Sequence, residues 1–99
     1  MPSEMTVPPL PELILYTRAG CGLCDEARWA IQGLLEDRAT RGARVALLRE
    51  RDIAADPDLE HELSDRIPVV ELRGKRLELV TSVARLRRFL DDGLDGRLV

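Results

Sequence analysis

The chain has 99 residues, of which 44% are hydrophobic and 33% charged, and its formal net charge is −3. This length fits one domain, and the composition is too apolar for intrinsic disorder. Basic residues are scattered among acidic ones, which argues against nucleic-acid binding by bulk charge. No apolar run approaches the roughly 20 residues that span a bilayer, and the N-terminus lacks the pattern of a secretory signal. We therefore expect a cytoplasmic protein that binds neither nucleic acid nor membrane.

The first part of the chain predicts a strand followed by a helix. Residues 1–11 contain four prolines and form the expected flexible lead-in. The apolar run 13–16 predicts a strand that is buried on both faces. From Leu23 onward, apolar residues recur at spacings of three and four, which indicates an amphipathic helix that ends near Gly42. Its predicted inner stripe consists of Ala27, Ala30, Ile31, Leu34 and Leu35. Trp29 lies on the same helix and is expected to be a packing residue.

A second strand is predicted over residues 44–52, so that strand, helix and strand form a parallel pair. Asp56 before Pro57 predicts a helix start, because aspartate accepts bonds from free amide groups and proline tolerates the first helical position. This short helix is expected to end near Leu63.

The last part of the chain predicts a hairpin and a helix. Residues 67–72 and 75–80 flank Arg73-Gly74, which indicates two antiparallel strands joined by a tight turn. Thr81 or Ser82 is expected to cap the last helix, and Gly93 to end it. The residues of this helix that we expect to face inward are Val83, Leu86, Phe89 and Leu90.

The predicted order is β-α-β-α-β-β-α, which indicates an α/β fold with a four-stranded mixed sheet and helices on both faces. The domain is expected to span residues 12–93, with residues 94–99 as a C-terminal tail.

Cys21-Gly22-Leu23-Cys24 lies between the first predicted strand and the first helix. This spacing allows both sulfurs to share one helical turn, within reach of a disulfide. Cys21 at the N-cap is expected to be the exposed, attacking sulfur, and Cys24 the buried, resolving one. The helix N-terminus lowers the pKa of the Cys21 thiol from about 8.5 by at most roughly 1.5. Arg18 would lower it further by direct pairing, whereas Asp25 and Glu26 oppose the effect.

Other interpretations of the cysteine pair remain open. A structural disulfide across so short a loop would contribute only about 2 kcal/mol. Two inert core thiols would not need to lie at a strand-to-helix junction. A structural zinc site needs four ligands, and beyond the two cysteines the sequence offers only the lone His61 and carboxylates. His61 is expected to be a solvated or partly packed side chain, and no metal site is predicted within one chain.

The segment 16–24, together with Arg66-Ile67-Pro68-Val69-Val70, resembles the glutaredoxin branch of the thioredoxin fold. More narrowly, the chain is similar to small bacterial glutaredoxin-like proteins of uncharacterised function. The resemblance implies a thioredoxin-like fold over residues 12–92. It also implies that Cys21 is the nucleophile, Cys24 the resolving cysteine and Arg18 the basic residue that precedes them. Pro68 would be the cis-proline that faces the disulfide, and Ile67 would offer its backbone to a thiol substrate beside Gly22 and Leu23.

One departure from that family concerns glutathione. Typical glutaredoxins have a paired glycine and an acidic residue that hold the tripeptide, whereas residues 77–82 of this chain contain no glycine. Side chains at positions 78–80 would crowd a bound glutathione, so we do not expect it to be an obligatory partner, and no bound cofactor is expected.

The leading hypothesis is therefore a monomeric thiol–disulfide oxidoreductase that acts on a disulfide-containing protein or a low-molecular-weight thiol. One alternative is a non-enzymatic binding module whose surface around Pro68 holds a partner peptide. Another is a metal ion shared between the Cys-x-x-Cys motifs of two chains.

Overall fold

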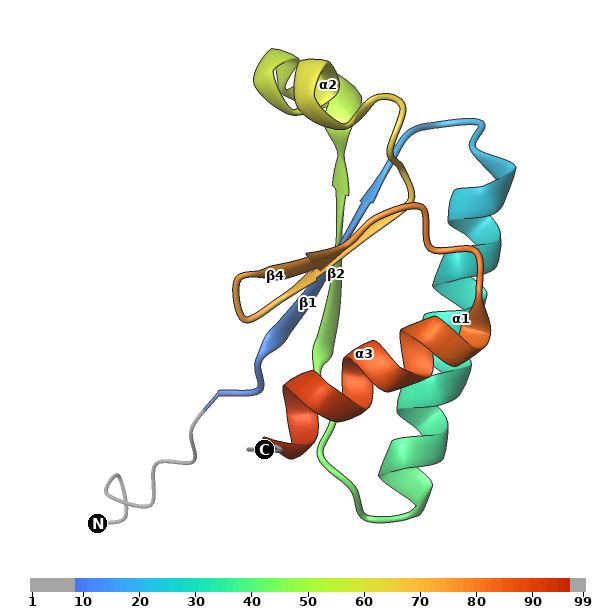
Figure 1. The fold of residues 1–99 in the computed structure, drawn as a ribbon, viewed down its shortest axis with the longest axis vertical. Helices are drawn as coiled ribbons and strands as arrows, with labels where there is room; N and C mark the ends of the chain where they lie inside the picture. Colours follow the sequence, from blue (N-terminus) through green and yellow to red (C-terminus); the bar gives the residue numbers. More distant parts are fainter. Residues whose placement is uncertain (1–8, 97–99) are drawn as a thin grey trace, which may run out of the picture.

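The computed structural model describes residues 9–96, which form a four-stranded sheet and three α-helices (Figure 1). Residues 1–8 of the expected lead-in lie outside this range, and residues 9–11 form neither helix nor strand. The elements are β1 (Glu12–Thr17), α1 (Gly22–Thr40), β2 (Leu47–Asp52), the short 3₁₀ turn η2 (Ile53–Ala55), α2 (Pro57–Leu63), β3 (Val69–Leu72), β4 (Lys75–Leu77) and α3 (Val83–Asp95). The predicted β-α-β-α-β-β-α order is confirmed.

The sheet is mixed, with the strand order β2-β1-β3-β4. β1 pairs in parallel with β2 and antiparallel with β3, and β3 pairs antiparallel with β4. β1 is central because its side chains are apolar on both faces: Leu13 and Leu15 are fully buried on one, and Tyr16 is nearly so on the other. The carboxyl end of β1 therefore leads directly from the middle of the sheet into the segment that carries the cysteines.

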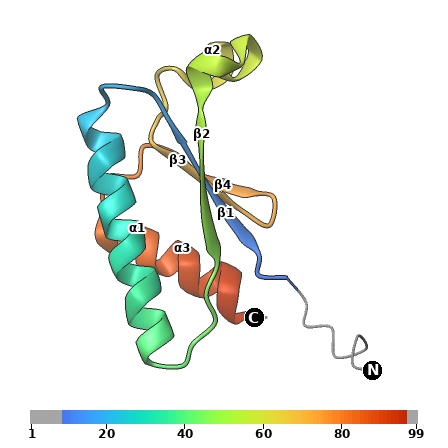
Figure 2. The ribbon, with the colours of Figure 1, turned by 180° about the vertical axis from the view of Figure 1, so that it is seen from behind.

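The main core lies between one face of the sheet and the helices α1 and α3, which cross on that face (Figures 1 and 2). Its buried members are Leu13, Leu15, Ala27, Ile31, Leu34, Ala46, Val70, Leu72, Val80, Leu86, Leu90 and Leu94. The predicted inner stripe of α1 is confirmed, with Ala30 and Leu35 partly buried at its margin. Trp29 was wrongly expected to pack, because it lies off that stripe and is 65% exposed.

α2 contacts the opposite face of the sheet, at the end of β1 and the start of β3. Leu63 packs there in a smaller cluster with Tyr16, Ile53 and Val69. Helices therefore lie on both faces, as predicted, but unequally: α2 covers only one end of its face (Figure 2). Asp56 caps α2 by accepting from the amide of Asp58, and Pro57 occupies the first turn, as the sequence predicts.

Three of the four strands, β2, β3 and β4, are shorter than the sequence predicts. β2 begins at Leu47 instead of Arg44, because the Arg44 carbonyl accepts a bond from the Arg38 side chain rather than from a strand. β3 begins at Val69, directly after Pro68, because proline has no amide hydrogen to donate to a neighbouring strand. β4 ends at Leu77 because Leu79 has a positive φ of 49°, which interrupts the extended backbone. The tight hairpin is confirmed: Arg73 and Gly74 both have positive φ, the geometry of a type I′ turn.

α3 differs from the prediction at its end. Ser82 caps its start by accepting from the amide of Arg85, which is one of the two predicted caps. Gly93 does not end the helix, which runs to Asp95 and is capped by Gly96 in the left-handed region. Leu94 is 1% exposed, so residues 94–95 belong to the core helix and not to a tail, while residues 97–99 lie outside the described range.

Three of the four residues of α3 that were expected to face inward do so. Leu86 and Leu90 are buried and Phe89 is partly buried against the core, as predicted. Val83 is 50% exposed and was wrongly placed inside. It lies in the first turn of α3, where the helix has not yet reached the sheet.

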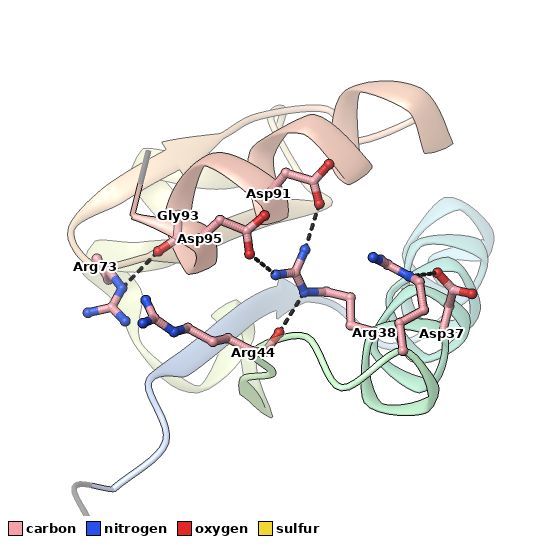
Figure 3. Close-up of polar contacts among 8 residues, drawn as sticks. Asp37, Arg38, Arg44, Arg73, Asp91, Gly93 and Asp95 are labelled. Atoms are coloured by element: carbon pink, nitrogen blue, oxygen red, sulfur yellow. Dashed lines mark hydrogen bonds and ion pairs between the residues drawn. The ribbon is translucent and has the colours of Figure 1, made fainter. Parts of the chain in front are cut away.

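Arg38 joins the far ends of the two main helices (Figure 3). Its side chain is only 3% exposed and donates to the Arg44 carbonyl at 2.6 Å, to Asp91 at 2.6 Å and to Asp95. A buried cation is costly unless it is paired and hydrogen-bonded, and three acceptors meet that requirement here. The contact fixes the end of α1 against the last turns of α3.

Gly93 supplies a stability test, because it faces the core where α3 meets β3. A Cβ at this position would overlap Leu72 Cδ2, whereas one at Gly33, on the exposed side of α1, would meet nothing within 4 Å. Gly33→Ala is expected to raise the free energy of unfolding by about 0.5–1 kcal/mol through helix propensity. Gly93→Ala is expected to lower it by about 1 kcal/mol, because overpacking outweighs the same propensity gain. Urea unfolding of both variants checks this, and equal stabilisation would contradict the close approach.

Glu71 holds a polar cluster on the sheet face that α2 leaves uncovered. Its carboxylate accepts from Arg76 at 2.9 Å and from the Tyr16 hydroxyl at 3.1 Å. The bond from Arg76 is the main cause that lowers the pKa of Glu71, with a smaller contribution from Tyr16, and partial burial opposes both.

This lowered pKa predicts a pH-dependent contribution to stability. Because the folded state holds the proton less tightly than the unfolded one, the contribution is full above the ordinary value of 4.5. It is lost as the pH falls through the lowered folded value. Urea unfolding of wild type and Glu71→Gln should therefore show a stability difference at neutral pH that shrinks on acidification below 4.5. A difference that stays constant down to acid pH would contradict the assignment.

Candidate functional site

The segment after β1 turns sharply before α1 begins. The Cys21 amide donates to the Arg18 carbonyl at 3.2 Å, which closes a four-residue turn. Gly20, the third residue of that turn, has a φ of +79°, a region that L side chains rarely adopt. The glycine before the first cysteine is therefore required by the turn that points Cys21 toward the start of the helix.

Cys21 is the N-cap residue of α1, as the sequence predicts. Its Sγ accepts a hydrogen bond from the amide of Cys24 at 3.1 Å, and its carbonyl accepts from the amide of Asp25 at 3.2 Å. A sulfur that accepts from a free helical amide lies at the positive end of the helix dipole. This position stabilises negative charge on Cys21 whenever the sulfur is a thiolate.

The two cysteines form a disulfide, with their Cα atoms 5.2 Å apart. Cys24 is 1% exposed and lies on the buried side of α1, whereas Cys21 is only partly buried. The bond therefore has one sulfur that a visiting thiol can approach and one that it cannot. The predicted asymmetry of the pair is present in the structure.

The charged residues around the first turn are paired with one another. Asp25 accepts from Arg28 at 2.7 Å, and Arg28 also forms two bonds to Glu50 of β2, at 2.6 and 2.8 Å. These bonds, mainly the pair to Glu50, hold the pKa of Arg28 above its usual value. Because Arg28 compensates the Asp25 carboxylate, Asp25 opposes a thiolate at Cys21 less than its place in the sequence suggests.

Arg18 contacts a residue that sequence reasoning did not single out. Its guanidinium pairs with Glu60 of α2 at 2.9 Å, across 42 positions of sequence. Its Nε is buried and has no hydrogen-bond partner among the described residues. The side chain is 38% exposed, so the pair itself is weak, since exposed ion pairs contribute about 0–1 kcal/mol. Arg18 thus retains an unused donor among the described residues, and no local signal could have revealed Glu60.

Gly22 and Leu23 are exposed, Leu23 to 49%, and Leu23 lines a shallow groove between the starts of α1 and α3. The groove has a volume of about 70 Å³ and a mixed polar and apolar lining. Its lining residues are Leu23, Glu26, Ala27, Ala30, Val80, Thr81, Ser82, Val83 and Leu86. It is several times smaller than the roughly 300–1,000 Å³ of a typical small-molecule pocket.

Ile67 and Pro68 lie at the same end of the sheet. Their peptide bond is cis, the isomer implied by the resemblance, and Pro68 is buried. The Pro68 carbonyl accepts from the amide of Val80, which lines the groove beside Leu23. The Ile67 amide already donates to the Leu63 carbonyl at 3.2 Å, so it is engaged within the chain. The structure thus brings the proline segment to the groove through Val80.

Within residues 9–96, no three His, Cys, Asp or Glu side chains come together in a way that could hold a metal ion. His61 lies exposed on α2. No helix in the same range has the length and apolar character needed to cross a membrane.

Comparison with known families and structures agrees with this arrangement. The family described as "Glutaredoxin-like domain (DUF836)" matches residues 12–91. The chain belongs to the glutaredoxin-like family. Its thioredoxin-like α/β fold, with the disulfide at the junction of β1 and α1, follows the element order predicted from the sequence. No protein of curated function matches the chain.

Two solved structures illustrate the similarity. The crystal structure of target protein XcR50 from X. campestris is 34% identical, with a TM-score of 0.64 over 80% of this chain and 95% of that one. The solution structure of protein Ne2328 from Nitrosomonas europaea is 23% identical, with a TM-score of 0.59 over 92% of this chain and 93% of that one. The first supports the family and the second the fold.

The unequal exposure of the two sulfurs predicts unequal alkylation of the reduced protein. With limiting iodoacetamide, Cys21 is expected to be labelled at least about tenfold faster than Cys24. A buried thiol reacts only after the structure opens locally. Peptide mapping by mass spectrometry measures the ratio. In urea, where the helix is unfolded, the two rates should converge, and comparable rates in the folded protein would contradict the assigned asymmetry.

Proposed function

We propose that this glutaredoxin-like protein is a thiol–disulfide oxidoreductase. The observation that supports this most directly is the disulfide between a partly exposed N-cap sulfur and a buried one three residues later in the same turn. A bond placed for stability alone gains little from an accessible sulfur at a helix N-terminus. Such a place suits a thiolate that attacks, because the helix amides stabilise its charge.

In the proposed reaction the reduced protein donates two electrons. The Cys21 thiolate attacks one sulfur of a substrate disulfide, the substrate S–S bond breaks, and its other sulfur leaves as a thiolate that takes a proton from water. Cys24 then loses its proton and attacks Cys21 Sγ. The second substrate sulfur leaves as a thiol, and the Cys21–Cys24 disulfide remains. An external thiol reductant must reduce that bond again. A reducing compartment supplies such thiols, which accords with the expected cytoplasmic location. The enzyme is expected to act as a monomer.

Arg18 would act in this reaction as a positioning residue. Its Nε has no hydrogen-bond partner among the described residues, and its backbone carbonyl closes the turn that carries Cys21. A donor kept in this place would support the thiolate form of Cys21 once the disulfide opens, while Glu60 holds the rest of the guanidinium.

The groove favours a disulfide within a polypeptide over glutathione as the substrate. About 70 Å³ is too small to enclose a tripeptide, and the glutamate that lines it, Glu26, would repel the carboxylates of glutathione. Leu23, Leu79 and Val83 are each about half exposed at this end of the molecule. An apolar side chain next to a substrate disulfide could be buried against them, at about 25 cal/mol per Å² of apolar surface.

A thiol-release assay tests the proposed function, using reduced protein and a peptide whose disulfide is flanked by leucine. Cys21→Ser is expected to lower the rate about a hundredfold or more, because a hydroxyl cannot replace the thiolate. Cys24→Ser is expected to stop after one turnover with the peptide bound covalently to Cys21, which intact mass spectrometry detects. Ala39→Ser, on the exposed side of the same helix, is the matched control and should react like wild type.

The outcomes that contradict the proposal are distinct. Equal activity of Cys21→Ser and wild type would refute the nucleophile. Peptide binding that survives loss of both cysteines, with no turnover by wild type, would instead indicate a binding module. Faster reaction with glutathione disulfide than with the peptide would refute the proposed substrate class alone.

A further inference from the structure

A second groove lies between the β3–β4 hairpin and the last turns of α3. It has a volume of about 490 Å³, which is within the range of small-molecule sites. Its lining consists of Arg44, Leu72, Arg73, Lys75, Phe89, Asp92, Gly93, Leu94 and Gly96. Leu72 pairs with Leu13 at the start of β1, so the groove lies at the opposite end of the sheet from Cys21. The proposed redox reaction does not use it.

The charge of this groove contrasts with that of the whole chain. Three cationic side chains, Arg44, Arg73 and Lys75, line it against one carboxylate, that of Asp92. Elsewhere the arginines are mostly neutralised: eight of them pair with carboxylates, namely Arg18, Arg28, Arg38, Arg41, Arg49, Arg51, Arg66 and Arg76. In a protein of net charge −3, this end is locally positive.

The cations have no acidic partners within the described part of the chain. Arg73 uses its Nε to donate to the Gly93 carbonyl at 2.9 Å, which holds the side chain against α3 and leaves its two terminal nitrogens available (Figure 3). The backbone carbonyl of Arg44 accepts from Arg38, but its guanidinium, like the Lys75 ammonium, forms no ion pair among residues 9–96. A guanidinium with two free donors matches the two oxygens of a carboxylate.

The other surface of the groove is apolar. Leu72 and Leu94 form buried walls, and Phe89 is partly exposed. Phe89 and Asp92 also line a neighbouring hollow of about 200 Å³ with Leu77, Arg85 and Arg88, so the apolar centre continues between further cations. A ligand that fits this lining has a negatively charged head and an apolar body.

We propose that this groove binds a small organic acid in which a carboxylate is attached to an aromatic or aliphatic group. The carboxylate would pair with Arg44, Arg73 and Lys75, and the apolar group would lie against Leu72 and Phe89. The C-terminal end of the α3 dipole and Asp92 oppose an anion here, but three full charges outweigh one carboxylate and about half a charge.

Titration of the full-length oxidised protein with phenylacetate tests the proposal, with amide NMR chemical shifts as the readout. Saturable shifts are expected at Gly74, Gly93 and Gly96, and none at Gly22 or Leu23. The neutral analogue phenylacetamide and the short anion acetate should each bind more weakly, because each lacks one half of the recognised chemistry. Raising the salt concentration should weaken the binding of phenylacetate.

Charge-removing variants identify the residues that bind. Arg44→Gln and Lys75→Gln are each expected to weaken phenylacetate binding about two- to fivefold, the range of solvent-exposed ion pairs, and the double variant about tenfold. Arg87→Gln removes the same charge from α3 outside both hollows and should bind like wild type. Urea unfolding of each variant shows whether its fold is intact.

Three results would overturn the proposal. The first is the absence of saturable shifts, or shifts confined to the Cys21 end. The second is equal binding of phenylacetamide, or equal weakening by Arg87→Gln, since either would mean that the groove cations do not recognise the head group. The third is binding that appears only when residues 97–99 are removed, since the chain itself would then occupy the groove. None of these results bears on the activity of Cys21.

Discussion

The packing of this small domain depends on how one buried cation is accommodated. Arg38 is almost fully enclosed, and a charge in that position is tolerated only because the Arg44 carbonyl, Asp91 and Asp95 all accept from it. Leaving a buried charge of this kind without its partners typically costs about 3–5 kcal/mol. The requirement fixes the crossing of α1 and α3 at one end (Figure 3).

The contact between the two helices is different at their other end, near the disulfide. There the starts of α1 and α3 are separated by the shallow groove beside Leu23, which has a mixed polar and apolar lining. Because the crossing is fixed by directional bonds at Arg38, the opening beside the disulfide does not have to be filled for the helices to stay in place. The same arrangement therefore allows a rigid core and an accessible sulfur in one helix of 19 residues.

The parts of the site that local sequence determines could be predicted. A cysteine directly before an amphipathic helix, with a second one three residues later, places one sulfur at the cap and the other inside for any regular helix. Residue type alone misled at Trp29, because its exposed place follows from helical periodicity rather than from its aromatic character. The contact of Arg18 with Glu60 could not be predicted, since 42 residues and a whole strand separate the two.

Gly93 shows the same limit for the fold. Locally, a glycine at the end of an amphipathic pattern is typical of a helix end, and Gly96 has that role. Gly93 is instead required by the approach of Leu72 from the hairpin, a contact that joins residues 21 positions apart. The strand boundaries deviate for a similar reason, because the Arg44 carbonyl bonds to a side chain from α1 instead of continuing β2.

Charge is distributed along the molecule in a way that composition conceals. Near the disulfide, Arg18 and Arg28 are bonded to glutamates of α2 and β2, so the surface that a substrate approaches has little uncompensated positive charge. At the other end of β1, Arg44 and Lys75 form no ion pair within the described residues, and they flank an apolar wall. Since exposed charges more than about 10 Å apart are largely screened at physiological salt, the two ends act as separate electrostatic environments. A net charge of −3 therefore does not exclude an anion site on this protein.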